Sequence, residues 1–171
     1  MTDIKVRVAQ LIDAPQVNEI FNYYAESSFV TLAEKTTLEE RKKWMTQFEL
    51  GTSKVLLVAQ RDGDVLGFAF SDKYNGGGVY KHTLELKGYV HPNHVGTSLG
   101  SHLYAALFGL LTEADFHRIV CEIPLPNEAA VAFHHKMGFD AVGTLKEHIF
   151  YRGKYYSALL MQKNLEVVYS D

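Results

Sequence analysis

Cysteine is nearly absent from this chain, which holds one, Cys121, among 171 residues. One cysteine excludes a disulfide framework within the chain and any CxxC zinc or redox motif. Long hydrophobic runs are absent too, because no stretch approaches the roughly 18 apolar residues of a membrane span. Residues 2–10 alternate polar and apolar types, which is typical of a strand and not of a signal peptide. We therefore expect a soluble protein of a reducing compartment, the cytoplasm.

Positive charge is not in excess, since 17 lysines and arginines face 20 aspartates and glutamates, for a net charge of −3. Nucleic acid and anionic lipid are attracted at long range by a positive field. Without such a field we expect neither nucleic acid nor a membrane as partner. Hydrophobic residues make up 47%, an ordinary globular balance that excludes a disordered chain. The length predicts a single domain over residues 1–171, because domains run roughly 100–200 residues.

Hydrophobic periodicity divides the chain into strands and helices. The expected strands are short alternating or apolar runs at residues 4–8, 55–60, 65–70, 83–90, 119–123, 141–151 and 155–165. The expected helices have apolar residues every three or four positions and begin at Asp13, Thr37, the 96–100 segment and Pro126-Asn127. Gly51 and Gly138 are expected to end the second and fourth helices. The order β-α-α-β-β-β-α-β-α-β-β predicts an α/β fold around a mixed sheet.

The most informative stretch joins strand 83–90 to the long apolar helix and reads Val95-Gly96-Thr97-Ser98-Leu99-Gly100-Ser101. Glycines there let the backbone approach a ligand closely, and the first N–H groups of the helix favour a phosphate. The alternative is that these glycines only form a turn and a helix cap. The junction is not a P-loop, since no Gly-Lys-Ser/Thr is present. It is not a Rossmann start either, since no acidic residue follows in a βαβ unit.

Sequence blocks around this junction carry a family resemblance. Residues 80–85 read Tyr-Lys-His-Thr-Leu-Glu, residues 89–92 read Tyr-Val-His-Pro, and residues 127–139 read Asn-Glu-Ala-Ala-Val-Ala-Phe-His-His-Lys-Met-Gly-Phe. Thr-Leu-Glu-Glu-Arg at residues 37–41 and Leu-Met-Gln-Lys at residues 160–163 add to them. With these blocks in this order, the chain resembles the GNAT superfamily of acyl-CoA N-acyltransferases over residues 4–163. Within that superfamily it is most similar to the phosphinothricin and amino-acid N-acetyltransferase branch.

The resemblance implies a mixed, mostly antiparallel central sheet with helices on both faces. Its two central parallel strands, here 83–90 and 119–123, splay apart and hold the pantetheine arm of acetyl-CoA. The pyrophosphate then lies on backbone N–H groups of the junction, from residues Val95, Gly96, Thr97, Ser98, Gly100 and Ser101. Val95 replaces an Arg or Gln of the family pattern, and Ser98 replaces its first glycine. Losing the arginine removes a charge-assisted contact, whereas the backbone donors and the helix dipole remain.

The resemblance also implies cofactor contacts outside the junction. Asn127 matches an asparagine that contacts CoA in many relatives, although capping a helix is a sufficient structural reason for it. The thioester carbonyl needs a hydrogen-bond donor where negative charge develops, and we expect a backbone N–H near Tyr89 and Val90. Gly88 indicates either a bulge that would free this N–H or a close backbone approach.

Glu85 matches the acidic residue that the amino-acid branch uses to prepare its substrate amine. An alkylammonium has a pKa near 10 and must lose a proton before it attacks a thioester. A carboxylate in the cleft accepts that proton directly or through water, and burial that raises its pKa helps. The alternative is an exposed strand glutamate paired with Lys87.

His134 matches the position where relatives carry histidine or tyrosine. There it would donate a proton to the departing CoA thiolate or assist with the amine proton. The alternative is a solvated helix histidine, which is how we interpret His135. Adjacent helix residues point about 100° apart and chelate one metal poorly. No cluster elsewhere has ligand spacing, so no metal is expected.

Four acceptor-binding residues are implied by the resemblance: Phe29, Tyr74, Tyr80 and Tyr151. Aromatic residues at such positions also complete the edge of a core, which is the alternative. Arg152 and Lys154 are candidates to receive a substrate carboxylate, and Arg152 is equally suited to a solvated turn. The branch often has Trp and Asp where this chain has Tyr155 and Ser157. This departure argues against phosphinothricin itself as the acceptor.

The residues and the resemblance together predict an N-acetyltransferase. It would move an acetyl group from acetyl-CoA to the primary amine of a small molecule, an amino acid or an analogue like phosphinothricin or methionine sulfoximine. Cys121 has no basic partner in view, so direct transfer without an acyl-enzyme is expected. The resemblance further implies a homodimer. The alternative is a catalytically silent CoA-binding sensor or regulatory protein, which Val95 and Ser98 favour and Glu85 and His134 oppose. A protein acetyltransferase would need an open acidic groove, which no acidic run indicates.

Overall fold

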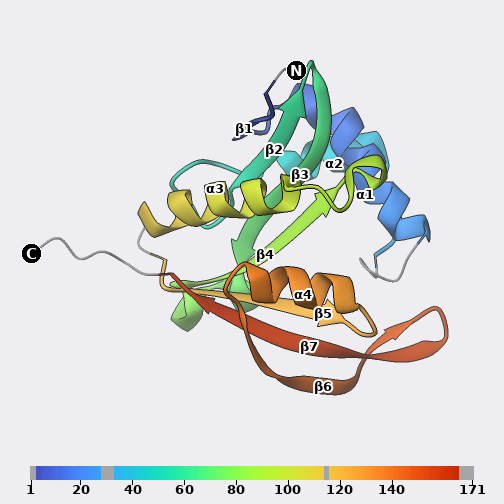
Figure 1. Ribbon diagram of the computed structural model, residues 1–171, viewed down its shortest axis with the longest axis vertical. Helices are drawn as coiled ribbons and strands as arrows, with labels where there is room; N and C mark the ends of the chain where they lie inside the picture. The colour runs from blue at the N-terminus through green and yellow to red at the C-terminus, as the bar shows by residue number, and fades with distance from the viewer. Residues whose placement is uncertain (1–2, 28–32, 114–115, 166–171) are drawn as a thin grey trace, which may run out of the picture.

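The described residues, 3–27, 33–113 and 116–165, form seven strands and four α-helices in the computed structural model (Figure 1). The strands are β1 (Lys5–Val8), β2 (Leu56–Arg61), β3 (Asp64–Lys73), β4 (Thr83–Val90), β5 (Arg118–Pro124), β6 (Asp140–Tyr151) and β7 (Lys154–Asn164). The helices are α1 (Ala14–Ser27), α2 (Leu38–Met45), α3 (Leu99–Glu113) and α4 (Glu128–Lys136). This order confirms the one predicted from the hydrophobic periodicity.

One sheet contains all seven strands, in the order β1-β2-β3-β4-β5-β7-β6. Neighbouring strands are antiparallel except β4 and β5, which are parallel. These two strands pair only where Thr83–Glu85 faces Arg118–Val120, and beyond this short ladder they separate. The mixed, mostly antiparallel sheet with splayed central strands is therefore confirmed.

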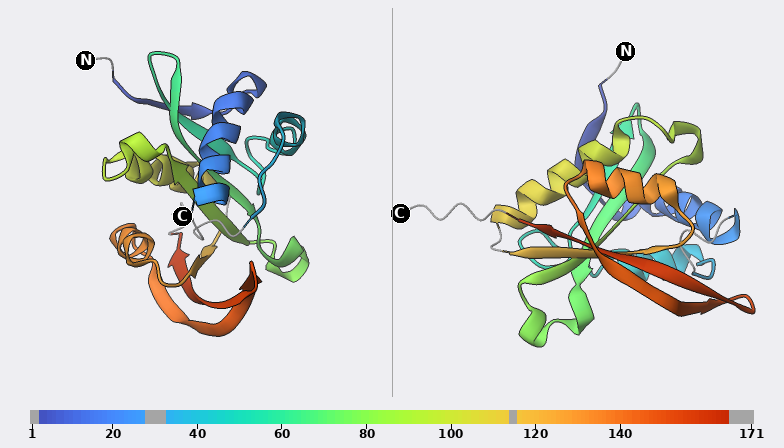
Figure 2. Two further views of the ribbon diagram at one scale, coloured as in Figure 1. Left: turned by 90° about the vertical axis from the view of Figure 1, so that its right-hand side faces the viewer. Right: turned by 60° about the horizontal axis from the view of Figure 1, so that its bottom comes forward.

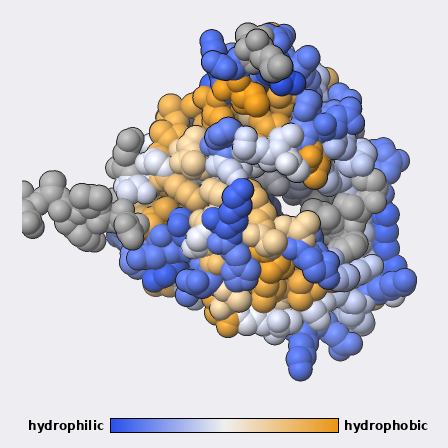
Figure 3. Space-filling view, viewed as in Figure 1, coloured by the Kyte–Doolittle hydropathy of each residue, from blue (hydrophilic) through white to orange (hydrophobic). Residues whose placement is uncertain are grey.

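Helices cover both faces of the sheet, as Figure 2 shows. The helices α1 and α2 pack on one face over a core that includes Val17, Met45 and Phe68. On the other face, α3 and α4 pack over a core that includes Leu84 and Leu103. Figure 3 shows hydrophobic residues gathered over α3 and α4, with hydrophilic residues around them. No helix in the described ranges is long and apolar enough to cross a membrane.

The end of α2 differs from the prediction. Thr37 caps the start of this helix as expected. The prediction that Gly51 ends it is wrong, because the helix ends at Met45. Phe48 instead packs against Phe70 of β3, with ring centroids 5.7 Å apart. Tertiary packing of this aromatic residue therefore accompanies the early end of the helix.

Asp13 joins β1 to the start of α1. It was expected to cap the helix, and it occupies the last position of the 3-10 turn before Ala14. Its two carboxylate oxygens accept hydrogen bonds from the Arg7 guanidinium at 2.7 and 2.8 Å. The backbone N–H of Gln10 donates to the same carboxylate at 2.8 Å. Burial raises the pKa of Asp13, but the hydrogen bonds from Arg7 and Gln10 outweigh it and hold this pKa below its usual value.

Candidate active site

A cavity of about 690 Å³ opens where β4 and β5 separate. Its wall includes parts of both strands, one side of α3 and α4, the β3–β4 connection and part of β6. Charged or polar side chains in the wall are Tyr74, Asn75, Glu85, Lys87, Tyr89, Tyr104, Cys121, Glu122, Asn127, His134 and His148. The cavity thus brings together both predicted catalytic residues and three of the predicted binding residues.

Glu85 and His134 belong to opposite faces of the sheet. Side chains two residues apart on a strand point the same way, so Glu85 shares its face with Tyr89, which packs in the α1–α2 core. His134 lies on α4, which covers the other face (Figure 2). A molecule that passes between β4 and β5 therefore meets one candidate on each side.

Two backbone N–H groups of β4 point toward the gap. The N–H of His91 donates to the Leu66 carbonyl on β3 at 2.8 Å, and N–H directions alternate along a strand. The N–H groups of Gly88 and Val90 therefore point away from β3, to the side from which β5 has separated. Tyr24 of α1 donates its hydroxyl to the Val90 carbonyl at 2.6 Å. This hydrogen bond fixes the end of β4 beside the gap.

Strand divergence, and not a bulge, exposes these donors. The prediction of a bulge at Gly88 is wrong, because β3 and β4 keep a continuous register through this residue. A side chain at Gly88 is excluded by Tyr104, since an added Cβ would lie 2.8 Å from Cε2 of that ring. Gly88 therefore marks a close approach, made by a tyrosine ring of α3 to the backbone of β4.

Glu85 is half-buried in the cavity wall. Burial raises the pKa of its carboxyl group, nearby Lys87 lowers it, and Asp72 and Glu122 raise it again, so that the pKa lies above its ordinary value. The ion pairs among the described residues include none between Glu85 and Lys87. Glu85 is therefore a carboxylate with enhanced proton affinity that faces a cavity.

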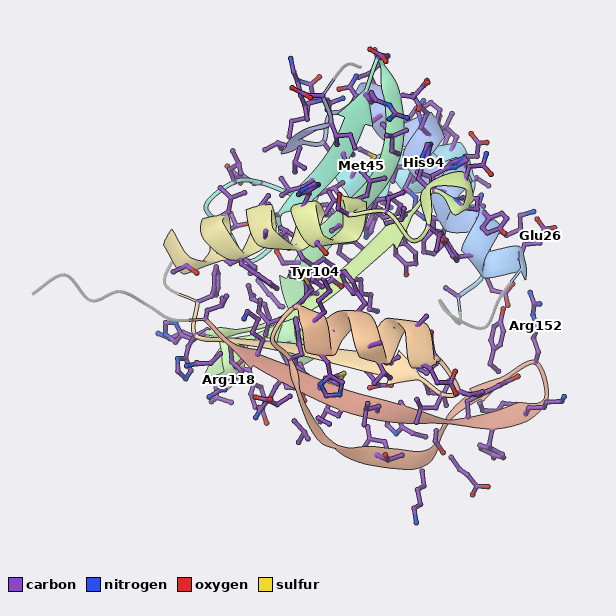
Figure 4. The ribbon with its side chains drawn as sticks, in the orientation of Figure 1. Glu26, Met45, His94, Tyr104, Arg118 and Arg152 are labelled. Carbon is purple, nitrogen blue, oxygen red and sulfur yellow. The ribbon has the colours of Figure 1, made fainter. Side chains whose placement is uncertain are left out.

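His134 is buried, with 8% of its surface exposed, and so is not the solvated histidine of the alternative interpretation. Its Nδ1 lies 2.8 Å from the carbonyl oxygen of Ala130. Its Nε2 lies 3.2 Å from the hydroxyl oxygen of Tyr104. Figure 4 shows Tyr104 directed from α3 toward α4. Both ring nitrogens of His134 therefore have partners within the protein.

The partners determine the protonation of the His134 ring. A carbonyl oxygen only accepts, so Nδ1 carries the proton that is shared with Ala130. Burial lowers the pKa of His134, the Ala130 hydrogen bond raises it and His135 lowers it, and the balance lies below the ordinary value. The ring is therefore neutral at neutral pH, its Nε2 is an acceptor, and Tyr104 donates to it. Burial also raises the pKa of Tyr104 well above its usual range, so this hydroxyl keeps its proton.

The predicted phosphate site lies outside the cavity wall, between β4 and α3. Gly96 has φ +80°, which glycine adopts without strain. Thr97 donates its hydroxyl to the His94 carbonyl at 2.6 Å and thereby closes the turn. Val95 is 65% exposed and offers no charge. The turn that the sequence predicted is present, and Val95 brings no basic side chain to it.

The start of α3 is an available helix N-terminus. The Ser98 carbonyl accepts from the N–H of His102 at 3.0 Å, which makes Ser98 the N-cap. The N–H groups of Gly100 and Ser101 precede this first helical bond and have no acceptor within the helix. An added Cβ at Gly100 would lie 3.2 Å from the ring of Phe133 on α4. Close packing of α3 on α4 is therefore a second reason for this glycine.

Asn127 has the structural role that the alternative interpretation gave it. Its Oδ1 accepts a hydrogen bond from the N–H of Ala130 at 3.2 Å and caps α4. It also lines the cavity, so its side-chain amide is within reach of a bound molecule. A contact with CoA stays a prediction.

The predicted acceptor residues are only partly brought together. Tyr74 lines the cavity and packs edge-on against Tyr80, with ring centroids 5.5 Å apart. Tyr80 is 44% exposed and lies outside the wall. Tyr151 ends β6, and its hydroxyl is buried without a hydrogen-bond partner among the described residues. Phe29 lies outside the described residues.

Arg152 and Lys154 are not part of the cavity wall. The guanidinium of Arg152 lies 5.0 Å from the centre of the Tyr151 ring and donates to the Ala25 carbonyl at 3.5 Å. Figure 4 shows this side chain directed from the end of the β6–β7 hairpin toward the end of α1. It therefore connects the hairpin to α1.

Cys121 is buried on β5, and burial raises the pKa of its thiol to about 12. A thiol with this pKa is protonated at neutral pH and is a poor nucleophile. In the described ranges, no group of three or more His, Cys, Asp or Glu side chains could hold a metal ion.

Sequence reasoning missed several polar side chains that line the cavity. Lys87 was considered only as an ion-pair partner of Glu85, although strand alternation places the two side chains on the same face of the strand. Tyr104 was not singled out, because it lies within an apolar helix. The one sign of it in the sequence is a single tyrosine in the apolar stripe of that helix. Glu122 and His148 approach each other to 3.7 Å. No local pattern connects these last two residues, because they lie on different strands.

The fold and the cavity have counterparts among known proteins. A family model described as an acetyltransferase (GNAT) domain matches residues 6–160, which is most of the chain. The chain belongs to the GNAT acetyltransferase family. This confirms the resemblance found in the sequence and makes the protein an acyltransferase.

Relatives of this GNAT protein include named N-acyltransferases. Phosphinothricin N-acetyltransferase of Streptomyces coelicolor is 31% identical over 95% of this chain and 97% of that protein. The L-amino acid N-acyltransferase MnaT of Escherichia coli is 26% identical over 95% of each chain.

Solved GNAT structures have the same fold. The ribosomal-protein-alanine N-acetyltransferase of Brucella melitensis has a TM-score of 0.89 and 30% identity, over 94% of this chain and 99% of that one. The acetyltransferase yncA of Salmonella typhimurium, solved with acetyl-CoA, has a TM-score of 0.90 and 23% identity, over 99% and 98%. The second likeness shows the shared fold.

Proposed function

We propose that this GNAT protein transfers an acetyl group from acetyl-CoA to the primary amine of a free amino acid or a close analogue. The observation that carries the proposal is the cavity between β4 and β5, which places Glu85 on one face of the sheet and α3 on the other. Two substrates can therefore approach the gap from opposite sides. The names of the phosphinothricin and L-amino acid acyltransferase relatives support an acceptor of this class.

The residues near α3 fit the anionic end of acetyl-CoA. The pyrophosphate would lie against the N–H groups of Gly100 and Ser101, after the turn at Gly96. A helix N-terminus favours phosphate through its free N–H groups and its dipole. Because Val95 adds no positive charge, affinity depends on these backbone donors. We expect weaker binding than in a relative with arginine at this position.

Glu85 would act as the general base. Its carboxylate would take a proton from the substrate ammonium, directly or through water. The amine nitrogen would then form the N–C bond and the C–S bond would break, so that CoA leaves as a thiolate. The second proton that this nitrogen loses would pass through water to the thiolate. The N–H groups of Gly88 and Val90 are the donors that would stabilise negative charge on the carbonyl oxygen. Cys121 takes no part in this direct transfer.

His134 would act through Tyr104 as a positioning residue. The one N–H of the neutral ring is shared with Ala130, so the ring has no proton to give toward the cavity. Its Nε2 instead accepts from Tyr104 and holds the hydroxyl group at the wall. The Tyr104 oxygen is thereby oriented to accept a hydrogen bond from a group in the cavity. This role replaces the predicted donation of a proton by His134 itself.

The second candidate is a CoA-binding protein without turnover. Val95 favours it, because a sensor could tolerate a weakened phosphate site. Glu85 opposes it, because a protein that only binds CoA needs no carboxylate of raised pKa on the far face of the gap.

We further propose a cytoplasmic homodimer that forms through the β6–β7 hairpin. The strand β6 is 12 residues long at the edge of the sheet, and an unprotected edge strand is prone to pairing. Phe150 and Tyr155 on this hairpin are 63% and 65% exposed. Sedimentation of the wild type and of Phe150→Asp tests the proposal, with a dimer and a monomer expected. A monomeric wild type would contradict it.

Calorimetric titration with acetyl-CoA, followed by a thiol-release screen over free amino acids and analogues, tests the function. Binding with turnover is the expected result. Binding without turnover on any amine would support the sensor. Absence of binding up to millimolar acetyl-CoA would exclude both functions.

A further inference from the structure

The cavity wall contains one lysine among its described residues and no arginine. This residue is Lys87 on β4. The other ionisable groups there include the carboxylates of Glu85 and Glu122 and the imidazoles of His134 and His148. A lone ammonium group in such a cavity is a potential receptor for a substrate anion.

Lys87 lies on the same face of β4 as Glu85. The two residues are two positions apart, so their side chains point the same way with Cα atoms about 6.6 Å apart. Their neighbours on β3 are Phe70 beside Lys87 and Asp72 beside Glu85. The flexible Lys87 side chain can therefore reach a molecule whose amine lies against Glu85.

The acidic neighbours of this pair lie close to other side chains. Asp72 forms an ion pair with Lys54, at 3.1 Å. Glu122 faces His148, at 3.7 Å. No ion pair among the described residues involves Lys87, which is exposed at the cavity. Its charge is consequently available to a ligand.

The phosphate groups of acetyl-CoA are not the expected partner of Lys87. The free helix N-terminus at Gly100 and Ser101 belongs to α3, which covers the opposite face of the sheet. Arg152 and Lys154, the cations that the sequence suggested as carboxylate receptors, lie outside the wall. Among the described residues of the cavity wall, Lys87 is the one lysine or arginine, and it lies on the face that holds Glu85.

We propose that Lys87 binds the carboxylate of the acceptor and makes this enzyme selective for amino acids over amines without an acid group. The inference rests on the proposed function and names the residue that determines which class of amine the enzyme accepts. The ammonium of the substrate lies against Glu85 and its carboxylate against Lys87. The negative Glu85 and the positive Lys87, which are neighbours on one face of β4, thus match the positive ammonium and the negative carboxylate of an amino acid.

Steady-state kinetics with free amino acids and their carboxamides test the inference. Wild-type enzyme is expected to prefer the acid of each pair. Lys87→Gln should raise KM for the acid about ten- to hundredfold, the range of a lost hydrogen bond to a charged group, and leave KM for the amide nearly unchanged. Lys87→Glu should reverse the preference. Lys81→Gln, an exposed lysine outside the wall, is the matched control and should behave as wild type.

The outcomes separate this inference from the proposed function. Equal turnover of acid and amide, unchanged in Lys87→Gln, would overturn the inference and leave the acetyltransferase function intact. An equal rise in KM for the acid and the amide in Lys87→Gln would also overturn it, because Lys87 would then not distinguish a carboxylate from a carboxamide. Absence of turnover with every amine by the wild type would overturn the function and the inference together. Melting temperatures of the variants, expected within a few degrees of the wild type, establish that each one is folded.

Discussion

The hydroxyl oxygen of Tyr104 lies 3.2 Å from Nε2 of His134 and joins α3 to α4 inside the cavity. The same tyrosine ring rests on the backbone of β4 at Gly88, where an added Cβ would lie 2.8 Å away. One side chain therefore connects both helices of this face to the strand whose N–H groups point toward the gap.

Tyr104→Phe and His134→Gln are expected to lower kcat to a similar degree, about ten- to hundredfold. Because His134 acts through Tyr104, the double variant should be little worse than either single variant. Kinetics of the three variants, as a double-mutant cycle, provide the measurement. Independent, multiplying losses would show that the two residues do not act as one unit. Acetyl-CoA affinity measured by calorimetry separates this effect from a change in the phosphate site.

Glu85→Gln should lower kcat by about 10²–10⁴ and leave the Kd of acetyl-CoA nearly unchanged. Glu122→Gln is the matched control, because Glu122 lines the same cavity but faces His148. We expect the control to change kcat less than tenfold. An unaltered rate in Glu85→Gln on a good substrate would remove this residue from the mechanism.

Activity should rise with pH as the Glu85 carboxyl group loses its proton. Burial raises this pKa above the ordinary value of a glutamate and Lys87 opposes the rise, so Lys87→Gln should move the acidic limb of kcat/KM to higher pH. Asp72 and Glu122 also raise this pKa, and His148 lines the same cavity. His148→Gln is therefore included to exclude a limb that belongs to the histidine. If the acidic limb of the pH profile remains in Glu85→Gln, it does not report the titration of Glu85, and the assignment is wrong.

Asp13 should contribute stability that depends on pH. Its pKa is lowered in the folded protein, so its contribution is complete above the unfolded value of about 3.9 and is lost as the pH falls through the folded value. We expect Asp13→Asn to reduce the free energy of unfolding at pH 7 by about 1–3 kcal/mol, and this difference to shrink below about pH 4. Urea unfolding from pH 7 to pH 3 measures this difference.

The control is Glu39→Gln, which breaks an exposed ion pair with Lys42 and should lower the free energy of unfolding by less than about 1 kcal/mol. A difference for Asp13→Asn that does not vary with pH would contradict the assignment.

Cys121 should resist thiol reagents in the native protein. Its pKa of about 12 and its burial both suppress the thiolate, which is the reactive form. Labelling with a chromogenic disulfide is expected only after unfolding. Cys121→Ala should keep its activity, since no acyl-enzyme forms. Rapid labelling of Cys121 in the folded protein, with loss of activity, would contradict direct transfer and support an acyl-enzyme on this residue.

Local patterns predicted the elements of the fold well where a strand or helix carries its own signal. Strand 83–90 was predicted with the bounds that β4 has, because turn residues stand on both sides of it. The end of α2 was not predictable from Gly51, because Phe48 packs against Phe70, far away in the sequence. Gly88 was ambiguous for a similar reason, since the ring that occupies its space comes from α3.

The candidate site was predicted in part. Glu85 and His134 were found from family motifs, and both line the cavity. The state of His134 was not predictable, because it depends on Tyr104 of another helix and on burial between the two. Lys87 was available from strand alternation alone, but its significance depends on Asp72 and Glu122 having other partners. Contacts of that kind arise only when distant strands assemble.

The short ladder between β4 and β5 gives this sheet two edges in its interior. Exposed strand edges ordinarily invite pairing with other chains and so promote aggregation. Here the two edges face each other across a cavity in the middle of the sheet, and residues of α3 and α4 form part of its wall. The protein thus keeps an unfilled hydrogen-bonding ladder beside a cavity at the centre of its sheet, and not at the outer edge, where pairing with another chain is easiest.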